Sequence, residues 1–226
     1  MMYLLLVTII PSIIILLFFI YSDKFREPRK SILKVFFYGC LICIPAFFAN
    51  TILDSFWFYQ TKVPEELIGS FLAPAFVEEA LKFSVLYYVV YKMKDFNEPI
   101  DGIVYGVTVS LGFATLENVY YVFIVGYENP LAVAYLRAFS AIPGHALDGV
   151  FMGYFFMKYV YVQKRNNLML SFLVPYFLHA YYNYFAVINY KLMYIELIIG
   201  WVAALILFKN LKSQQKLKKS EYEEKI

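Results

Sequence analysis

Seven apolar stretches dominate this chain, each close to or longer than the roughly 20 residues that a helix needs to cross a bilayer. They cover residues 2–21, 32–53, 67–91, 100–127, 132–158, 168–189 and 192–208. The chain is 62% hydrophobic and 16% charged, whereas a soluble domain is roughly 45–50% apolar and about 25% charged. The excess apolar surface predicts burial in lipid. We therefore expect an all-α, polytopic membrane bundle of about seven transmembrane helices.

A single membrane domain is expected over residues 1–226, because the connections are short and polar and we find no soluble domain or internal repeat. The charged end, residues 209–226, is interpreted as a cytoplasmic tail. The first stretch lacks a positive segment before it and a small-residue cleavage site, which favours a retained helix over a signal peptide. Cys40 and Cys43 lie inside an apolar stretch and are interpreted as packing residues.

The basic residues predict the orientation of the bundle, since cytoplasmic loops carry an excess of Lys and Arg. With the N-terminus outside, most of the 20 basic residues fall in the first, third and fifth connections and in the tail, all on the cytoplasmic side. Only Lys62 and Lys191 fall outside, while Lys82 and Arg137 lie within apolar stretches. An odd number of spans, N-out and C-in, satisfies this asymmetry.

Polar side chains occur in the middle of four consecutive stretches, where a charged group costs roughly 2.5–3.5 kcal/mol on insertion scales. They are Glu78, Glu79, Lys82, Glu117, Arg137, His145, Asp148, His179 and Asn183. Glutamates and histidines from all four stretches fall near the bilayer midplane at 1.5 Å per residue. Such groups are stabilised in lipid when they share one buried, water-accessible cavity, which we therefore expect.

Helix breakers and small residues support this cavity. Pro74, Pro143 and Pro175 each precede one of the polar side chains by two to four residues, and each proline frees a backbone carbonyl and opens the helix. Small residues at four-residue spacing favour close helix packing. These residues are Gly102, Gly106, Ser110, Gly149 and Gly153.

Spacing along the helices predicts which polar groups share a face. Glu78 and Lys82 are four residues apart and are expected to pair. His179 and Asn183 have the same spacing and face the same way. A carboxylate base, imidazoles and an amide donor are what water activation and oxyanion stabilisation require.

Structural interpretations of the same residues stay open. A Glu–Lys pair can be a packing ion pair, and a membrane histidine can be a hydrogen-bonded core residue. Arg137 and Asp148 can form a structural pair or lie at the outer surface, and Asp101 is interpreted as a helix N-cap. A transporter or proton-coupled channel would use midplane Glu, His and Lys equally, although we find no inverted repeat. A non-catalytic scaffold would need them only for stability.

Four motifs in chain order resemble those of the PrsW family of intramembrane proteases, within the larger CAAX-processing and Abi-type superfamily. They are EEALK at 78–82, FATLEN at 113–118, GHALDG at 144–149 and HAYYN at 179–183. The resemblance implies a multi-pass protease of the bacterial cell membrane that makes the first regulated cut in a membrane-anchored anti-sigma factor. A sigma factor for stress or antimicrobial-peptide resistance genes is then released. The implied partners are a single-pass anti-sigma factor and membrane lipid, with no nucleic acid.

The resemblance also implies roles for individual residues. Carried over by position, the catalytic set is Glu78, Glu79, His179, Asn183, His145 and Glu117. Lys82 and Arg137 are assigned to supporting ion pairs, and the matching Asp148 is left out of the set. Two histidines and several glutamates could compose a zinc site, but the chain has no HExxH motif. We predict a glutamate-type site without a cofactor, and zinc is the alternative.

Overall fold

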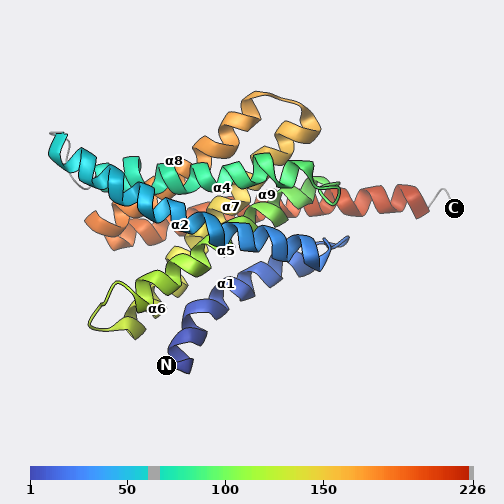
Figure 1. Cartoon of the computed structure of the whole chain (residues 1–226). Helices are drawn as coiled ribbons and strands as arrows, with labels where there is room; N and C mark the ends of the chain where they lie inside the picture. Colours follow the sequence, from blue (N-terminus) through green and yellow to red (C-terminus); the bar gives the residue numbers. More distant parts are fainter. Residues whose placement is uncertain (61–66, 224–226) are drawn as a thin grey trace.

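The computed structural model describes residues 1–60 and 67–223, and all regular secondary structure in these ranges is helical (Figure 1). The elements are α1 (Met2–Ser22), α2 (Arg29–Gln60), η1 (Ile68–Ala75), α4 (Phe76–Tyr88), η2 (Val90–Lys92), α5 (Pro99–Phe123), α6 (Pro130–Phe139), α7 (Ala141–Val162), α8 (Asn166–Ile188) and α9 (Tyr190–Glu223). The predicted all-α class is confirmed. The predicted positions of Lys62 and Lys225 lie outside the described residues.

Four helices are long and apolar enough to cross a membrane by length and composition. They contain the segments Met2–Ser22, Arg29–Leu53, Pro99–Phe123 and Tyr190–Ser213. The first, second and fourth predicted stretches thus correspond to α1, α2 and α5, and the seventh corresponds to α9, which continues past the bundle towards the C-terminus (Figure 1). The number of spans and their orientation stay predictions.

The fifth predicted stretch is not one helix. It is divided at Ser140, whose φ of −130° and ψ of −72° interrupt the helix between α6 and α7. Pro143 supplies the physical reason, because it lacks the N–H that would bond the carbonyl of Phe139 four residues earlier. The third stretch is also irregular, since π-helical η1 contains Pro74 and leads directly into α4. Pro175 does not have this effect, because α8 continues through it.

Helix α5 lies at the centre of the bundle, with 89% of its most apolar window buried. It packs closely against α7 because glycines face each other across the contact. A Cβ added to Gly102 would lie 2.6 Å from the carbonyl oxygen of Gly153, and one added to Gly106 would overlap the backbone of Gly149. The predicted small-residue packing is confirmed. Cys40 also packs on α5, donating to the carbonyl of Gly112 at 3.1 Å.

Connections that were predicted to be cytoplasmic lie at one end of the bundle. Tyr105 of α5 donates a hydrogen bond to Glu27 in the first connection, and Ser31 of α2 donates to Asp95 in the third. Burial, aided by the charges of Asp23 and Asp95, raises the pKa of Glu27 to about 7. These contacts link the first and third connections to α5 and fix the ends of the central helices.

Asp101 also belongs to this end, but it is not the N-cap of α5. Glu98 is the N-cap, and Asp101 occupies the N3 position of a capping box. Its Oδ2 accepts from the backbone N–H groups of Asn97 at 2.8 Å and Glu98 at 2.6 Å. Asp101 therefore caps the helix from inside its first turn, and the helix begins three residues earlier than predicted, with Glu98 as the N-cap.

Candidate active site

A cavity of about 1380 Å³ opens among α2, η1, α4, α5, α6, α7, α8 and α9. Its charged and amide lining side chains are Asn50, Glu78, Glu117, Arg137, His145, Asp148, His179, Asn183 and Glu196. The structure thus brings together residues that the sequence separates by more than 100 positions. Glu79 and Lys82 are fully enclosed, with 0% exposure, behind this wall.

The two adjacent glutamates have different surroundings because consecutive side chains on a helix point about 100° apart. Both lie in the first turn of α4. Glu78 lines the cavity, and its Oε1 accepts from the amide of Asn50 on α2 at 3.3 Å. Glu79 Oε1 accepts from Lys82 Nζ and from His179 Nδ1, each at 2.7 Å.

The predicted pairing of Glu78 with Lys82 is therefore wrong. Lys82 pairs with Glu79, three residues earlier, and both side chains are 0% exposed. Spacings of three and four residues both bring side chains together on a helix. The choice follows from the surroundings, since Glu79 shares the buried side of α4 with Lys82 while Glu78 faces the cavity.

Hydrogen bonds assign the proton of each imidazole. Lys82 Nζ lies 3.0 Å from His145 Nδ1, and an ammonium can only donate, so Nδ1 accepts and the proton of His145 is on Nε2. That N–H donates to Glu117 Oε2 at 2.9 Å. His179 has the opposite tautomer, because its Nδ1 donates to Glu79. Its Nε2 then presents a lone pair 3.9 Å from Glu78 Oε2.

Arg137 lies in the site and not at the outer surface. Its guanidinium donates to Glu117 Oε2 and to Asn118 Oδ1, each at 2.5 Å, and lies 4.0 Å from the ring centroid of Tyr121. The side chain is 14% exposed. Arg137 thus neutralises Glu117, which also accepts from His145, and the predicted supporting role in an ion pair fits this geometry.

Asp148 does not pair with Arg137 in the structure. Its Oδ2 lies 3.9 Å from His179 Nδ1, and the residue is buried beside the two histidines. Asn183 lines the cavity one turn after His179, as its spacing predicted. Its side-chain amide has no hydrogen-bond partner within the described ranges and can bind a ligand in the cavity.

Three polar residues of the site were missed by the sequence analysis. Asn118 lies in the FATLEN motif but was given no role, although it connects Arg137 to the carbonyl of Thr8 on α1. Asn50 and Glu196 lie near the ends of the second and seventh apolar stretches, which were interpreted as lacking ionisable groups in their middles. The criterion that found the other residues, a polar group in the middle of an apolar stretch, misses both, because Asn50 lies three residues from the end of its stretch and Glu196 four residues from the start of its own.

Comparisons with known proteins decide the family. A family model described as "PrsW family intramembrane metalloprotease" matches residues 27–209. The chain belongs to the PrsW family. Proteins named Protease PrsW are similar to it over most of their length, whereas no solved structure matches. The predicted family, the peptidase class and the multi-pass membrane location are confirmed.

Three PrsW relatives illustrate the extent of the similarity. The protein of Geobacillus kaustophilus is 37% identical over 177 residues, covering 77% of this chain and 75% of the relative. That of Bacillus subtilis is 37% identical over 180 residues, covering 78% and 79%. That of Clostridioides difficile is 32% identical over 199 residues, covering 86% and 83%.

The PrsW description raises the question of a metal. Glu79, His145, Asp148 and His179 are all buried, and each offers one ligand atom within 4.8 Å of the others. Imidazoles and carboxylates are ordinary zinc ligands, so the donor chemistry fits a divalent metal. However, the ammonium of Lys82 already contacts two of the four, Glu79 and His145. The cluster can bind a metal, and the predicted absence of a cofactor stays a prediction.

Proposed function

We propose that this PrsW-family protein is a glutamate-type intramembrane endopeptidase that makes the first cut in a single-pass membrane anti-sigma factor. Further proteolysis of the anti-sigma factor then releases a sigma factor. The observation that carries the chemistry is the position of Glu78 Oε2, which lies 3.9 Å from His179 Nε2. Family membership and the motifs shared with PrsW proteases support the substrate class.

Glu78 is the base in this proposal because it lines the cavity, whereas Glu79 is enclosed behind it. A water molecule hydrogen-bonded to both Glu78 Oε2 and His179 Nε2 can span their separation. Glu78 takes a proton from this water as the water oxygen attacks the scissile carbonyl carbon. Glu78 then gives the proton to the leaving amine nitrogen. Glu79 acts through His179, because its hydrogen bond to Nδ1 holds the imidazole in the required tautomer.

The negative charge that develops on the carbonyl oxygen needs a donor. Asn183 lines the cavity one helical turn from His179, and its amide has no other partner in the described part of the chain. We assign it the oxyanion contact, since a donor that is already in place is worth about 3–4 kcal/mol to such reactions. Glu117 and Arg137 also line the cavity, and Glu117, which Arg137 neutralises, holds His145 in its own tautomer.

The position of Lys82 supports the metal-free form of the proposal. Its ammonium supplies the positive charge that Glu79 would otherwise take from a metal ion. A metal at this site would be held by Glu79, His145, Asp148 and His179, and would supply Lewis-acid activation of water. Chelation separates the two mechanisms. Purified enzyme should keep its activity in a strong chelator, and a loss reversed only by added zinc would refute the glutamate mechanism.

The substitution Glu78→Gln tests the catalytic assignment. A glutamine amide oxygen can still accept from Asn50, so folding should be preserved, whereas the base is lost and cleavage should fall by about 100-fold or more. The assay is immunoblotting of membranes that contain a co-expressed, doubly tagged anti-sigma factor. The control is Glu128→Gln, which removes an exposed carboxylate outside the cavity. Full cleavage by the Glu78→Gln variant would refute the role of Glu78.

A further inference from the structure

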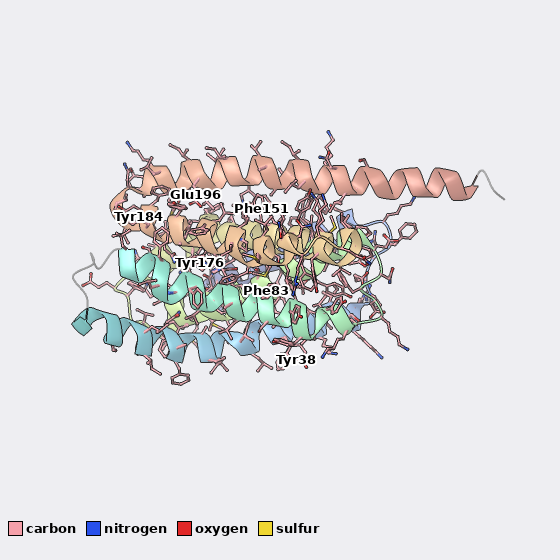
Figure 2. All side chains as sticks on the ribbon, turned by 90° about the horizontal axis from the view of Figure 1, so that it is seen from above. Tyr38, Phe83, Phe151, Tyr176, Tyr184 and Glu196 are labelled. Carbon is pink, nitrogen blue, oxygen red and sulfur yellow. The ribbon has the colours of Figure 1, made fainter. Side chains whose placement is uncertain are left out.

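Glu196 is a carboxylate of the cavity that the mechanism does not use. It lies on α9 in the candidate membrane span Tyr190–Ser213, and it lines the cavity. Figure 2 shows it at the end of the bundle where Tyr184 of α8 also lies. Its Oε2 is buried and has no hydrogen-bond partner in the described part of the chain. A carboxylate in a membrane span is costly without such a partner, so it indicates a functional site.

The surrounding charges do not neutralise Glu196. Lys82 is paired with Glu79 and Arg137 with Glu117, so neither of these two cations is available to Glu196. Asp148, a second carboxylate, lines the same cavity, and no ion pair joins Glu196 to a basic side chain in the described part of the chain. A cationic ligand would therefore supply the partner that the buried Oε2 of Glu196 lacks.

The antiparallel pair α8 and α9 gives the depth of Glu196 relative to the catalytic residues. The two helices meet at Asn189. His179 precedes Asn189 by ten residues and Glu196 follows it by seven, so at 1.5 Å per residue Glu196 lies about 5 Å nearer the α8–α9 connection. An extended substrate covers this distance in one or two residues.

We propose that Glu196 forms an anionic subsite that binds a lysine or arginine side chain of the protein substrate. The basic residue lies within about two residues of the scissile bond, on the side of the α8–α9 connection, which is the predicted outer side. This inference rests on the proposed function, because it assumes that the cavity accepts a polypeptide. It adds a preference for positive charge that the catalytic residues do not provide.

Peptide binding to the full-length Glu78→Gln variant in detergent micelles tests the subsite without cleavage. The probes are synthetic peptides of about 20 apolar residues with a polar flank on the outer side. Each carries Lys, Gln or Glu at one of three consecutive positions next to the apolar segment. At one position the Lys peptide should bind about tenfold more tightly than the Glu peptide, which corresponds to 1.4 kcal/mol.

Changes at Glu196 should alter this ratio in a defined order. Adding Glu196→Gln should reduce it to less than about twofold, Glu196→Lys should reverse it, and Glu196→Asp, which keeps the charge, should largely preserve it. Adding Glu128→Gln, which removes an exposed carboxylate outside the cavity, should leave it unchanged. The proposal would be overturned if the full preference for Lys remained after Glu196→Gln. It would also be overturned if the protein with Glu196 intact showed no preference for Lys at any of the three peptide positions.

Cleavage by the protein with Glu78 intact distinguishes this inference from the proposed function. If the Lys preference depends on Glu196 but neither the peptides nor an anti-sigma factor is cut, the subsite stands and the proposed function fails. If the anti-sigma factor is cut and the binding ratio does not depend on Glu196, the proposed function stands and the subsite fails.

Discussion

Replacing Lys82 by methionine should destabilise the protein strongly, because it leaves Glu79 buried without its cation. Lys82 Nζ lies 2.7 Å from Glu79 Oε1 and 3.0 Å from His145 Nδ1, and the ion pair is 0% exposed. Its ammonium also lies 4.6 Å from the ring centroid of Phe113. Methionine keeps most of the volume and the apolar stem, so the change removes the charge with little loss of packing.

The size of the effect follows from this geometry. Two unit charges separated by 2.7 Å attract each other by about 6 kcal/mol at an effective dielectric constant of 20. Desolvation offsets much of that attraction, but removing only one partner leaves a buried charge and costs about 3–5 kcal/mol. The double variant Lys82→Met with Glu79→Gln removes both charges. It should recover about 2 kcal/mol of this loss.

Unfolding of the full-length protein by dodecyl sulfate in mixed micelles measures these free energies. Fluorescence of Trp201 reports the transition, since its ring packs 6.3 Å from that of Phe19. Lys94→Met, at an exposed lysine, is the control and should change stability by less than about 0.5 kcal/mol. The reasoning is refuted if Lys82→Met costs less than about 1 kcal/mol, or if the double variant is no more stable than the single one.

Two further predictions concern packing and pH. Gly153→Ala should cost about 1–3 kcal/mol of stability, because its Cβ would overlap the carbonyl oxygen of Gly102. Gly69→Ala is the control and should not destabilise the protein, since a Cβ there meets nothing within 4 Å. Similar losses of stability in the two variants would contradict this prediction. The pKa of Glu27 is raised from 4.5 to about 7 by burial and neighbouring carboxylates, so the folded state holds this proton more tightly than the unfolded state. Stability should therefore fall as the pH rises from about 4.5 to 7. The full change in pKa corresponds to about 3 kcal/mol, solvent screening reduces this fall to roughly 2 kcal/mol, and Glu27→Gln should reduce it further. Unfolding midpoints at pH 5 and 8 measure it, and an equal fall in both proteins would exclude the assignment.

Much of the fold and of the candidate site could be predicted from local sequence properties. Apolar stretches of sufficient length predict helices in lipid. Polar groups inside these stretches cost free energy in lipid however the helices are arranged. This is why Glu78, His145 and His179 could be placed in one cavity before any contact was known. Pro143 was expected to open its helix, but the division of the fifth stretch into two helices at Ser140 was not predicted. A proline alone does not decide between these outcomes, since α8 continues through Pro175.

The sequence by itself determined that the chain forms membrane helices with a polar centre. The hydrophobicity of a residue, and the free-energy cost of placing a polar residue in lipid, are properties of that residue alone. The sequence could not determine which of two adjacent glutamates faces the cavity. That depends on partners from three other helices: Asn50 binds Glu78, His179 binds Glu79, and His145 contacts Lys82. A rotation of α4 by one residue would exchange the two roles without changing a letter of the sequence. Only tertiary packing fixes that rotation, and with it the choice of Glu78 as the proposed base.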